Sequence, residues 1–270
     1  MKTPSKKIDD NTEAIGCKSE WAGEGDSNAA LTTQSSAIDP RLVIRGESFN
    51  TPHINNENSH PYSAHTDWLN FTFELQDTDE SINQFRKNLK NAVGNDFEEL
   101  TELGKGWLGF KRSFEIGDTG ARFAIGCQQG RAMVSLSGNA CQFISKQGWA
   151  NLVELMTSIY EGRITRWDGA VDDLVGEHSI EWAVDQYRNG GFSTGGNKPF
   201  TLQHGDWEIR NGNGRTFEVG RRKNGKFLRV YEKGKEQGDP NSPWVRWELQ
   251  LGKQGREIPW LVLLLSLIHI

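Results

Sequence analysis

Residues 216–234, TFEVGRRKNGKFLRVYEKG, contain two stretches of alternating apolar and polar residues on either side of the pair Asn224-Gly225. Such alternation is typical of half-buried β-strands, and Asn-Gly favours a two-residue hairpin turn. Residues 122–138, RFAIGCQQGRAMVSLSG, share the order of Phe, aliphatic and Gly residues, with one residue fewer in the turn. The similarity predicts two related halves, in which Ser135 occupies the place of Tyr231.

The segments around these hairpins contain strand and helix patterns in a similar order. Apolar residues at helical spacing predict helices over residues 79–93, 145–160 and 179–189. Alternation predicts strands over residues 66–75, 107–116, 121–128, 132–138, 163–173, 200–209, 215–222, 226–233 and 244–251. We therefore expect an α+β fold, with an antiparallel sheet built from two β-α-β-β-β-type halves and helices packed on one face.

The two ends of the chain differ in composition from its middle. Residues 1–64 are rich in Ser, Asn, Thr, Gly and Asp, and they contain too few apolar residues to offset the entropy of folding, which predicts a disordered polar tail. The last residues, 265–270, resemble a translated adapter from sequencing libraries, so we expect this end to be non-native. The folded domain is therefore expected over residues 65–260, with a C-terminal segment missing.

The overall charge and the cysteines exclude several classes of protein. A net charge of -5 over 270 residues argues against a protein that coats nucleic acid or anionic membranes by bulk attraction. Three cysteines without a C-x-x-C pair argue against a disulfide framework and favour the cytoplasm. The chain begins without a secretory signal, and the apolar residues 260–270 are too few for a membrane helix, so no membrane partner is expected.

Three of the predicted strands each have one charged side. A two-residue turn would place Glu218 opposite Tyr231 and Thr216 opposite Lys233, with Arg229, Tyr231 and Lys233 on the polar face. By the same alternation, Arg166, Asp168 and Asp172 share one side of residues 163–173, while Arg246 and Glu248 share one side of residues 244–251. We expect these strands to form a surface that combines a phenol, cations and carboxylates.

This combination of side chains suits phosphoryl chemistry. A tyrosine becomes nucleophilic near neutral pH only beside positive charge or a base, and Arg229 and Lys233 supply such charge. Acids such as Asp168 and Glu248 suit a hard divalent cation that polarises a phosphoryl oxygen. Residues 215–235 carry eight Lys or Arg against two Glu, which indicates a polyanionic ligand. The six histidines include no His-x-His pair, so carboxylates are expected to lead the coordination.

Three segments together resemble the replication initiation factor family, the trans-acting rolling-circle initiators of plasmids and filamentous phages. These segments are RITRWDGAVDD (163–173), FEVGRRKNGKFLRVYEKG (217–234) and WVRWELQL (244–251). The similarity runs from about residue 67 to residue 251. With HTDWLNFTF (65–73) and the long polar leader, the chain most resembles the filamentous-phage initiators. The resemblance implies a metal-dependent nickase that cuts one strand at an origin, forms a 5′-phosphotyrosyl intermediate and religates the ends.

The resemblance also implies roles for individual residues. Tyr231 is the implied nucleophile, with Arg229 and Lys233 beside the phosphate. The implied ligands of Mg²⁺ or Mn²⁺ are Asp168, Glu248 and, as a weaker candidate, Asp172. The expected DNA-binding residues are Arg221, Arg222, Lys223, Lys226, Arg246 and Arg166. Glu218 is a candidate from strand register alone, and Glu232 stands where the family more often has aspartate.

The partners and the alternative functions follow from the same resemblance. The expected partners are origin DNA, as duplex and as single strand, host replication proteins such as helicase and polymerase, and a second copy of the chain in a homodimer. Two alternatives stay open: a conjugative relaxase of the same chemistry, and a non-catalytic single-stranded DNA-binding protein. The relaxase is disfavoured because the first 64 residues show no helix-turn-helix pattern, and the binding protein would not need Tyr231.

Overall fold

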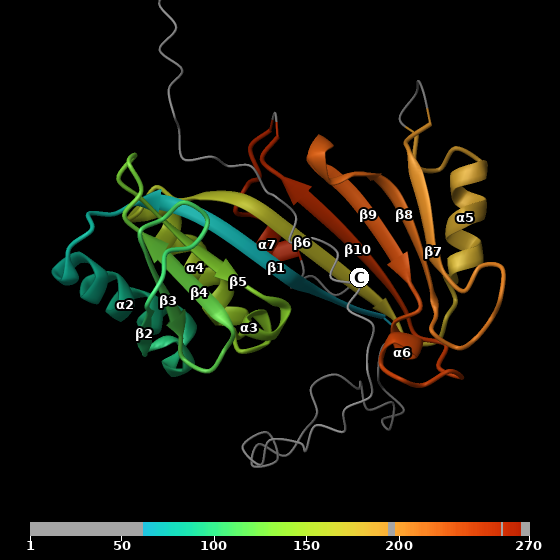
Figure 1. Ribbon diagram of the computed structural model, residues 1–270, viewed down its shortest axis with the longest axis horizontal. Helices are drawn as coiled ribbons and strands as arrows, with labels where there is room; N and C mark the ends of the chain where they lie inside the picture. Colours follow the sequence, from blue (N-terminus) through green and yellow to red (C-terminus); the bar gives the residue numbers. More distant parts are fainter. Residues whose placement is uncertain (1–61, 194–197, 255, 266–270) are drawn as a thin grey trace, which may run out of the picture.

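A single ten-stranded antiparallel sheet is the largest feature of the computed structural model, which describes residues 62–193, 198–254 and 256–265 (Figure 1). The strands are β1 (Tyr62–Glu74), β2 (Leu100–Leu103), β3 (Arg112–Ile116), β4 (Ala121–Ile125), β5 (Arg131–Leu136), β6 (Arg163–Asp173), β7 (Thr201–Gly205), β8 (Arg215–Arg221), β9 (Lys226–Tyr231) and β10 (Val245–Gly252). The helices are α2 (Asp79–Val93), α3 (Gly138–Gln142), α4 (Lys146–Ser158), α5 (Ile180–Arg188), α6 (Lys233–Glu236) and α7 (Val262–Leu265), with short 3-10 turns η1 (Asn95–Phe97) and η2 (Arg222–Asn224). Most of the predicted polar tail lies outside the described residues, although β1 already begins at Tyr62.

The strand order β2-β3-β4-β5-β1-β6-β10-β9-β8-β7 places the two long strands β1 and β6 side by side at the centre. The α+β class and the large antiparallel sheet are confirmed. The β-α-β-β-β pattern is not, because four strands follow β1-α2 and four follow β6-α5. The alignment of the two halves was also wrong: counted outward from the centre, the β8-β9 hairpin corresponds to β3-β4, whereas residues 122–138 contain β4 and β5. Ser135 therefore does not occupy the place of Tyr231.

The helices begin where side chains cap them. The Thr78 hydroxyl accepts a hydrogen bond from the Ser81 backbone N at 3.2 Å, which starts α2, and Ser145 accepts one from the Gly148 backbone N at 3.0 Å, which starts α4. Helix α2 then buries the apolar side that its sequence period predicts: Ile82, Phe85, Leu89 and Val93. The capped amphipathic helices thus form where the sequence predicted them.

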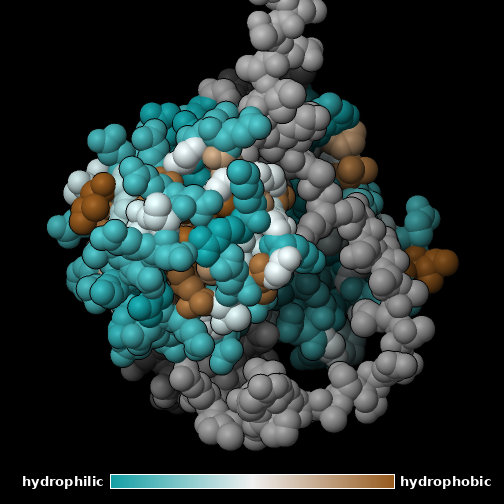
Figure 2. Space-filling model, turned by 60° about the vertical axis from the view of Figure 1, so that its left-hand side comes forward, coloured by the Kyte–Doolittle hydropathy of each residue, from teal (hydrophilic) through white to brown (hydrophobic). Residues whose placement is uncertain are grey.

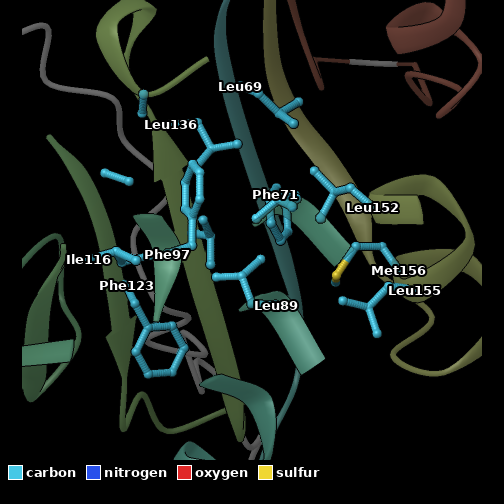
Figure 3. Close-up of a cluster of buried hydrophobic side chains, with 14 of the residues drawn as sticks. Leu69, Phe71, Leu89, Phe97, Ile116, Phe123, Leu136, Leu152, Leu155 and Met156 are labelled. Carbon is cyan, nitrogen blue, oxygen red and sulfur yellow. The ribbon is translucent and has the colours of Figure 1, made fainter. Parts of the chain in front are cut away.

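Two apolar cores lie on the same face of the sheet. The larger one joins α2 and α4 to β1, where Leu69 and Phe71 are fully buried (Figure 3). The smaller one joins α5 to β8, β9 and β10 and includes Phe217 and Val230. On β10, Trp247 packs against the smaller core and Leu251 against the larger one, and side chains four apart share one face of a strand. Helices α2, α4 and α5 therefore cover one face, as predicted, and polar residues of β6, β10 and β9 occupy the opposite face.

The hairpin between β8 and β9 differs from the predicted two-residue turn. Arg221 pairs with Lys226, so four residues form the connection: the three of η2 and Gly225, whose φ of 73° is left-handed. The register is therefore shifted by two residues, which places Thr216 opposite Tyr231 and Glu218 opposite Arg229. Because side chains alternate with a period of two, the shift leaves the predicted polar side unchanged.

The surface seen from the side of α2 is mostly hydrophilic, with hydrophobic residues scattered among polar ones (Figure 2). Within the described part of the chain, every helix is too short or too polar to span a lipid bilayer.

Candidate active site

Strands β6, β10 and β9 lie side by side, so the three predicted polar sides meet on one face of the sheet. Arg246 pairs with both Tyr231 of β9 and Asp172 of β6. Two residues further along β10, Glu248 pairs with Arg229 and Ala170. The arrangement joins residues that are 80 positions apart in the chain, Asp168 and Glu248, as sequence alternation predicted.

Tyr231 is the last residue of β9 and is 8% exposed. Its hydroxyl lies 3.4 Å from Glu248 Oε2, at the outer limit of a hydrogen bond. Two cations lie by its ring: the Arg229 guanidinium carbon is 4.9 Å and Lys233 Nζ is 5.7 Å from the centroid. Lys233 was predicted to lie on the strand, but it is the first residue of α6. There its ammonium pairs with Glu236 at 2.8 Å. The phenol thus has cations beside its ring and a carboxylate near its oxygen.

The surroundings of Tyr231 hold the phenol in its protonated form. Burial and the negative charge of Glu248 raise the pKa of Tyr231 well above its ordinary value near 10. The positive charges of Arg246 and Arg229 act in the opposite direction without cancelling the rise. A group that neutralises Glu248 would therefore lower the pKa of the phenol.

Arg229 and Glu248 form a close ion pair below the tyrosine ring. Arg229 Nη2 lies 2.8 and 2.7 Å from the two Glu248 oxygens, and Glu248 is 5% exposed. The Arg229 Nε is buried and has no hydrogen-bond partner among the described residues. A buried donor without a partner costs free energy, so an acceptor that reaches this nitrogen would be bound favourably.

Asp168 is the most buried acid of the polar face, at 1% exposure. Burial raises the pKa of Asp168 to about 6, although Arg166 opposes the rise by donating from Nε at 2.8 Å and from Nη2. The charge of Glu248 adds to the increase, because Glu248 pairs with Ala170, two residues from Asp168. The two carboxylates therefore repel each other across β6 and β10.

A second ion-pair cluster lies at the other end of the polar face. Arg246 donates to both oxygens of Asp172, at 2.7 and 2.9 Å, and to Asp67 Oδ1 at 3.1 Å. Trp244 Nε1 also donates to Asp172, at 2.7 Å. His65 lies between the two acids, 3.7 Å from Asp67 and 3.8 Å from Asp172. Arg246, predicted to bind DNA, is thus held by carboxylates, and Asp172 by a cation and an indole.

Sequence reasoning missed the contribution of β1 to this face. His65, Asp67 and Trp68 reach it because a bulge between Thr66 and Trp68 interrupts the alternation of β1. Trp68 lies opposite Asp168, and its ring packs 4.8 Å from the Arg166 guanidinium carbon. The signal in the sequence is the polar segment HTDW (65–68) at the start of a strand pattern, which is typical of a strand with one polar side.

The predicted basic residues of the hairpin lie away from Tyr231. Arg221, Arg222, Lys223 and Lys226 surround the β8-β9 turn, whereas Tyr231 ends β9. Tyr231 lies five positions after Lys226, which is about 17 Å along a strand. Glu218, predicted opposite Tyr231, faces Arg229 instead and lies 3.5 Å from His204. These residues are not in the cluster around the phenol.

The acids of the polar face fit a divalent cation only as a two-carboxylate site. In residues 62–193, 198–254 and 256–265, no group of three or more His, Cys, Asp or Glu side chains is arranged to hold a metal ion. Asp168 and Glu248 nevertheless repel each other, and a cation between them would relieve that repulsion. Mg²⁺ typically binds one or two carboxylates and keeps several waters, so this pair is a compatible donor set.

Comparisons with known proteins agree with the resemblance expected from the sequence. Residues 162–268, which include β6 to β10, match the family described as replication initiation factor. A solved structure described as a rolling circle replication initiator protein from Geobacillus stearothermophilus is similar, with a TM-score of 0.59 and 24% identity, over 76% of this chain and 78% of that chain. At this identity the likeness shows the fold alone. A search among curated proteins gave no match.

Proposed function

From the confirmed resemblance of residues 162–268 to the replication initiation factor family, we propose that this chain initiates rolling-circle replication by cutting one DNA strand with Tyr231. One observation carries the proposal: within the matched segment, a buried tyrosine adjoins cations and the carboxylate of Glu248, which in turn repels Asp168 on the neighbouring strand. Structural roles alone rarely place so many charges on one partly buried face, because each buried charge needs compensation.

The proposed reaction is a transfer of a phosphodiester to the phenol. The Tyr231 oxygen attacks the phosphorus, the new bond links tyrosine to the 5′ phosphate, and the bond to the 3′ oxygen breaks. The phenol loses its proton and the departing oxygen gains one, which leaves a free 3′ hydroxyl. Rejoining is the reverse reaction, in which a 3′ hydroxyl attacks the phosphotyrosine. Glu248 is the acceptor nearest the phenol, at 3.4 Å.

Arg229 and Lys233 are suited to hold the phosphate beside the phenol. Both lie against the Tyr231 ring, and the Arg229 Nε is a buried donor that a phosphate oxygen would satisfy. Arg229 is shared with Glu248, so a phosphate would compete with that carboxylate for the guanidinium. Positive charge around the phosphorus would stabilise the negative charge that develops on its oxygens.

Asp168 and Glu248 would hold the divalent cation, Mg²⁺ or Mn²⁺, with Asp172 contributing only if it leaves Arg246. When bound, such a cation supplies positive charge that polarises the phosphoryl oxygen under attack. Neutralising Glu248 would also remove one of the causes that raise the pKa of Tyr231. The carboxylates thus would couple cation binding to activation of the phenol.

The test is nicking of a supercoiled plasmid that carries the cognate origin, with Mg²⁺ or Mn²⁺ present. We expect Tyr231→Phe to abolish nicking and the covalent DNA adduct while DNA affinity stays within about twofold, since the phenol oxygen makes one weak contact. Tyr187→Phe, on α5, is the matched control and should nick normally. Chelating the divalent cation should also stop nicking. Unchanged nicking by Tyr231→Phe would refute Tyr231 as the nucleophile, whereas DNA binding without any nicking by the wild-type protein would leave the non-catalytic DNA-binding function as the better account.

A further inference from the structure

A pocket of about 420 Å³ lies on the sheet near the start of β6, at the opposite end of that strand from Asp172. Four cations line it: Arg131 from β5, Arg163 from β6, and Lys253 and Arg256 from the segment after β10. Glu257 is the single acid in its lining. The pocket therefore carries a local formal charge of about +3 in a chain whose net charge is -5.

The four cations differ from the other arginines of the polar face. Arg166, Arg229 and Arg246 are each bound to a carboxylate. The side chains of the four pocket cations form no ion pair or hydrogen bond with any residue that the structure describes. All four are exposed, so each can reach a ligand without first breaking an internal contact. Unpaired cations that converge on a pocket are typical of sites for anions.

The pocket lies on the same face of the sheet as Asp168. Asn70 pairs with Arg166 and Thr72 with Arg163, and residues two apart on β1 point to the same side. The Thr72-Arg163 pair lies four positions along β1 from the Trp68-Asp168 pair, which is a distance of roughly 13 Å. The pocket therefore lies nearer to Asp168 than to Tyr231, which pairs with Arg246 at the level of Asp172.

The backbone connects the pocket to the basic β8-β9 turn. Gly252 N donates to Gly225 O at 3.0 Å, which places the end of β10 against that turn, and Lys253 N donates to Thr165 O at 3.2 Å on β6. The turn carries Arg222, Lys223 and Lys226. The basic residues therefore continue from the turn across the ends of β10 and β6, along one edge of the polar face.

We propose that this pocket binds backbone phosphates of the DNA strand that flanks the cleavage point. Arg163 and Lys253 hold the strand a few nucleotides from the phosphate at Tyr231, without reading bases. A second pocket shares Thr72, Arg131 and Arg163 but also has Glu74 and Glu161 in its lining, so the phosphates occupy the first pocket. The identity of the polyanion rests on the proposed function, whereas anion binding rests on the unpaired cations alone.

The test measures how affinity for DNA depends on salt. The probe is a fluorescent single-stranded oligonucleotide of 24 nucleotides that contains the nick site, in chelator so that no cleavage occurs. We expect Arg163→Gln with Lys253→Gln to weaken binding on the order of tenfold at low salt, and to reduce the slope of log K against log salt by about 1.4, or ~0.7 per lost contact. Arg163→Lys with Lys253→Arg should restore both values.

Lys87→Gln is the control, because Lys87 is an exposed cation on α2, which covers the opposite face. It should leave the affinity and the slope unchanged. A double variant that keeps the wild-type slope would overturn the pocket assignment, even if Tyr231 cleaves DNA. A reduced slope in a protein that never cleaves DNA would keep the pocket and sink the proposed nicking function, so the two failures give different results.

Discussion

At the scale of single residues, Glu248 links two groups of the polar face whose pKa values are raised. Its charge contributes to raising the pKa of both Tyr231 and Asp168. Replacing Glu248 by Gln removes that charge and leaves Arg229 nearby, so we expect both pKa values to fall. Carbon-13 NMR of labelled tyrosine and aspartate, titrated in wild type and variant, measures the change. Glu218→Gln, on the neighbouring strand β8, should leave the titration of Asp168 unaffected.

The same variant changes how stability depends on pH. Because the folded pKa of Asp168 is about 6, above its unfolded value near 4, the folded state binds more protons between these values. Asp168 therefore contributes a loss of stability as pH rises from about 4 to 6. Glu248→Gln should make this loss smaller, as measured by urea unfolding at several pH values. An unchanged or steeper loss in the variant would contradict the coupling between the two carboxylates.

At the scale of elements, Gly220 shows why β8 needs a glycine. Its φ is 91°, in the left-handed region, and an added Cβ would lie 2.8 Å from the Lys226 carbonyl oxygen. We expect Gly220→Ala to lower the free energy of unfolding by about 1–3 kcal/mol, measured by urea denaturation. Gly104→Ala, where a Cβ meets no atom within 4 Å, should change it by less than ~0.5 kcal/mol. Equal effects of the two changes would contradict a strained position in β8.

The hairpin of β8 and β9 also shows how far sequence patterns predict structure. Alternation correctly predicted which side of β9 carries Arg229 and Tyr231, because the polar side depends only on a period of two. The Asn-Gly pair predicted the wrong turn, since η2 and Gly225 form a four-residue connection. The register, and with it the partner of Tyr231, depends on turn length and was not recoverable from the strand pattern. Lys233 was similarly misplaced because β9 ends at Tyr231.

At the scale of the whole molecule, the central strands join the two halves into one sheet. Leu69 of β1 is fully buried and pairs with Leu136 of β5 and Trp167 of β6, so it contacts both halves. We expect Leu69→Ala to cost about 2–5 kcal/mol and to speed hydrogen exchange in both α2 and α5, measured by mass spectrometry. Leu202→Ala, exposed on the outermost strand β7, is the control. Faster exchange in α2 alone would contradict a single cooperative sheet.

Whole-molecule features were the least accessible to sequence analysis. The sequence predicted the class, most strands and the helices α2, α4 and α5, because periodicity is a local property. It did not predict β2, nor which hairpins of the two halves correspond, because strand order depends on contacts between distant segments. The same limit hid the contribution of Asp67 and His65 to the polar face, since only strand pairing places β1 beside β6.

The most direct measurement of the central claim is to identify the residue that becomes joined to DNA. The protein is incubated with Mn²⁺ and a single-stranded oligonucleotide that carries the nick site, then digested, and the peptide bearing the nucleotide is sequenced by mass spectrometry. We predict that the nucleotide is attached through its 5′ phosphate to Tyr231, in a peptide from residues 226–236. Attachment to Tyr62, Tyr160 or Tyr187, or cleavage of the oligonucleotide without any protein adduct, would contradict the account.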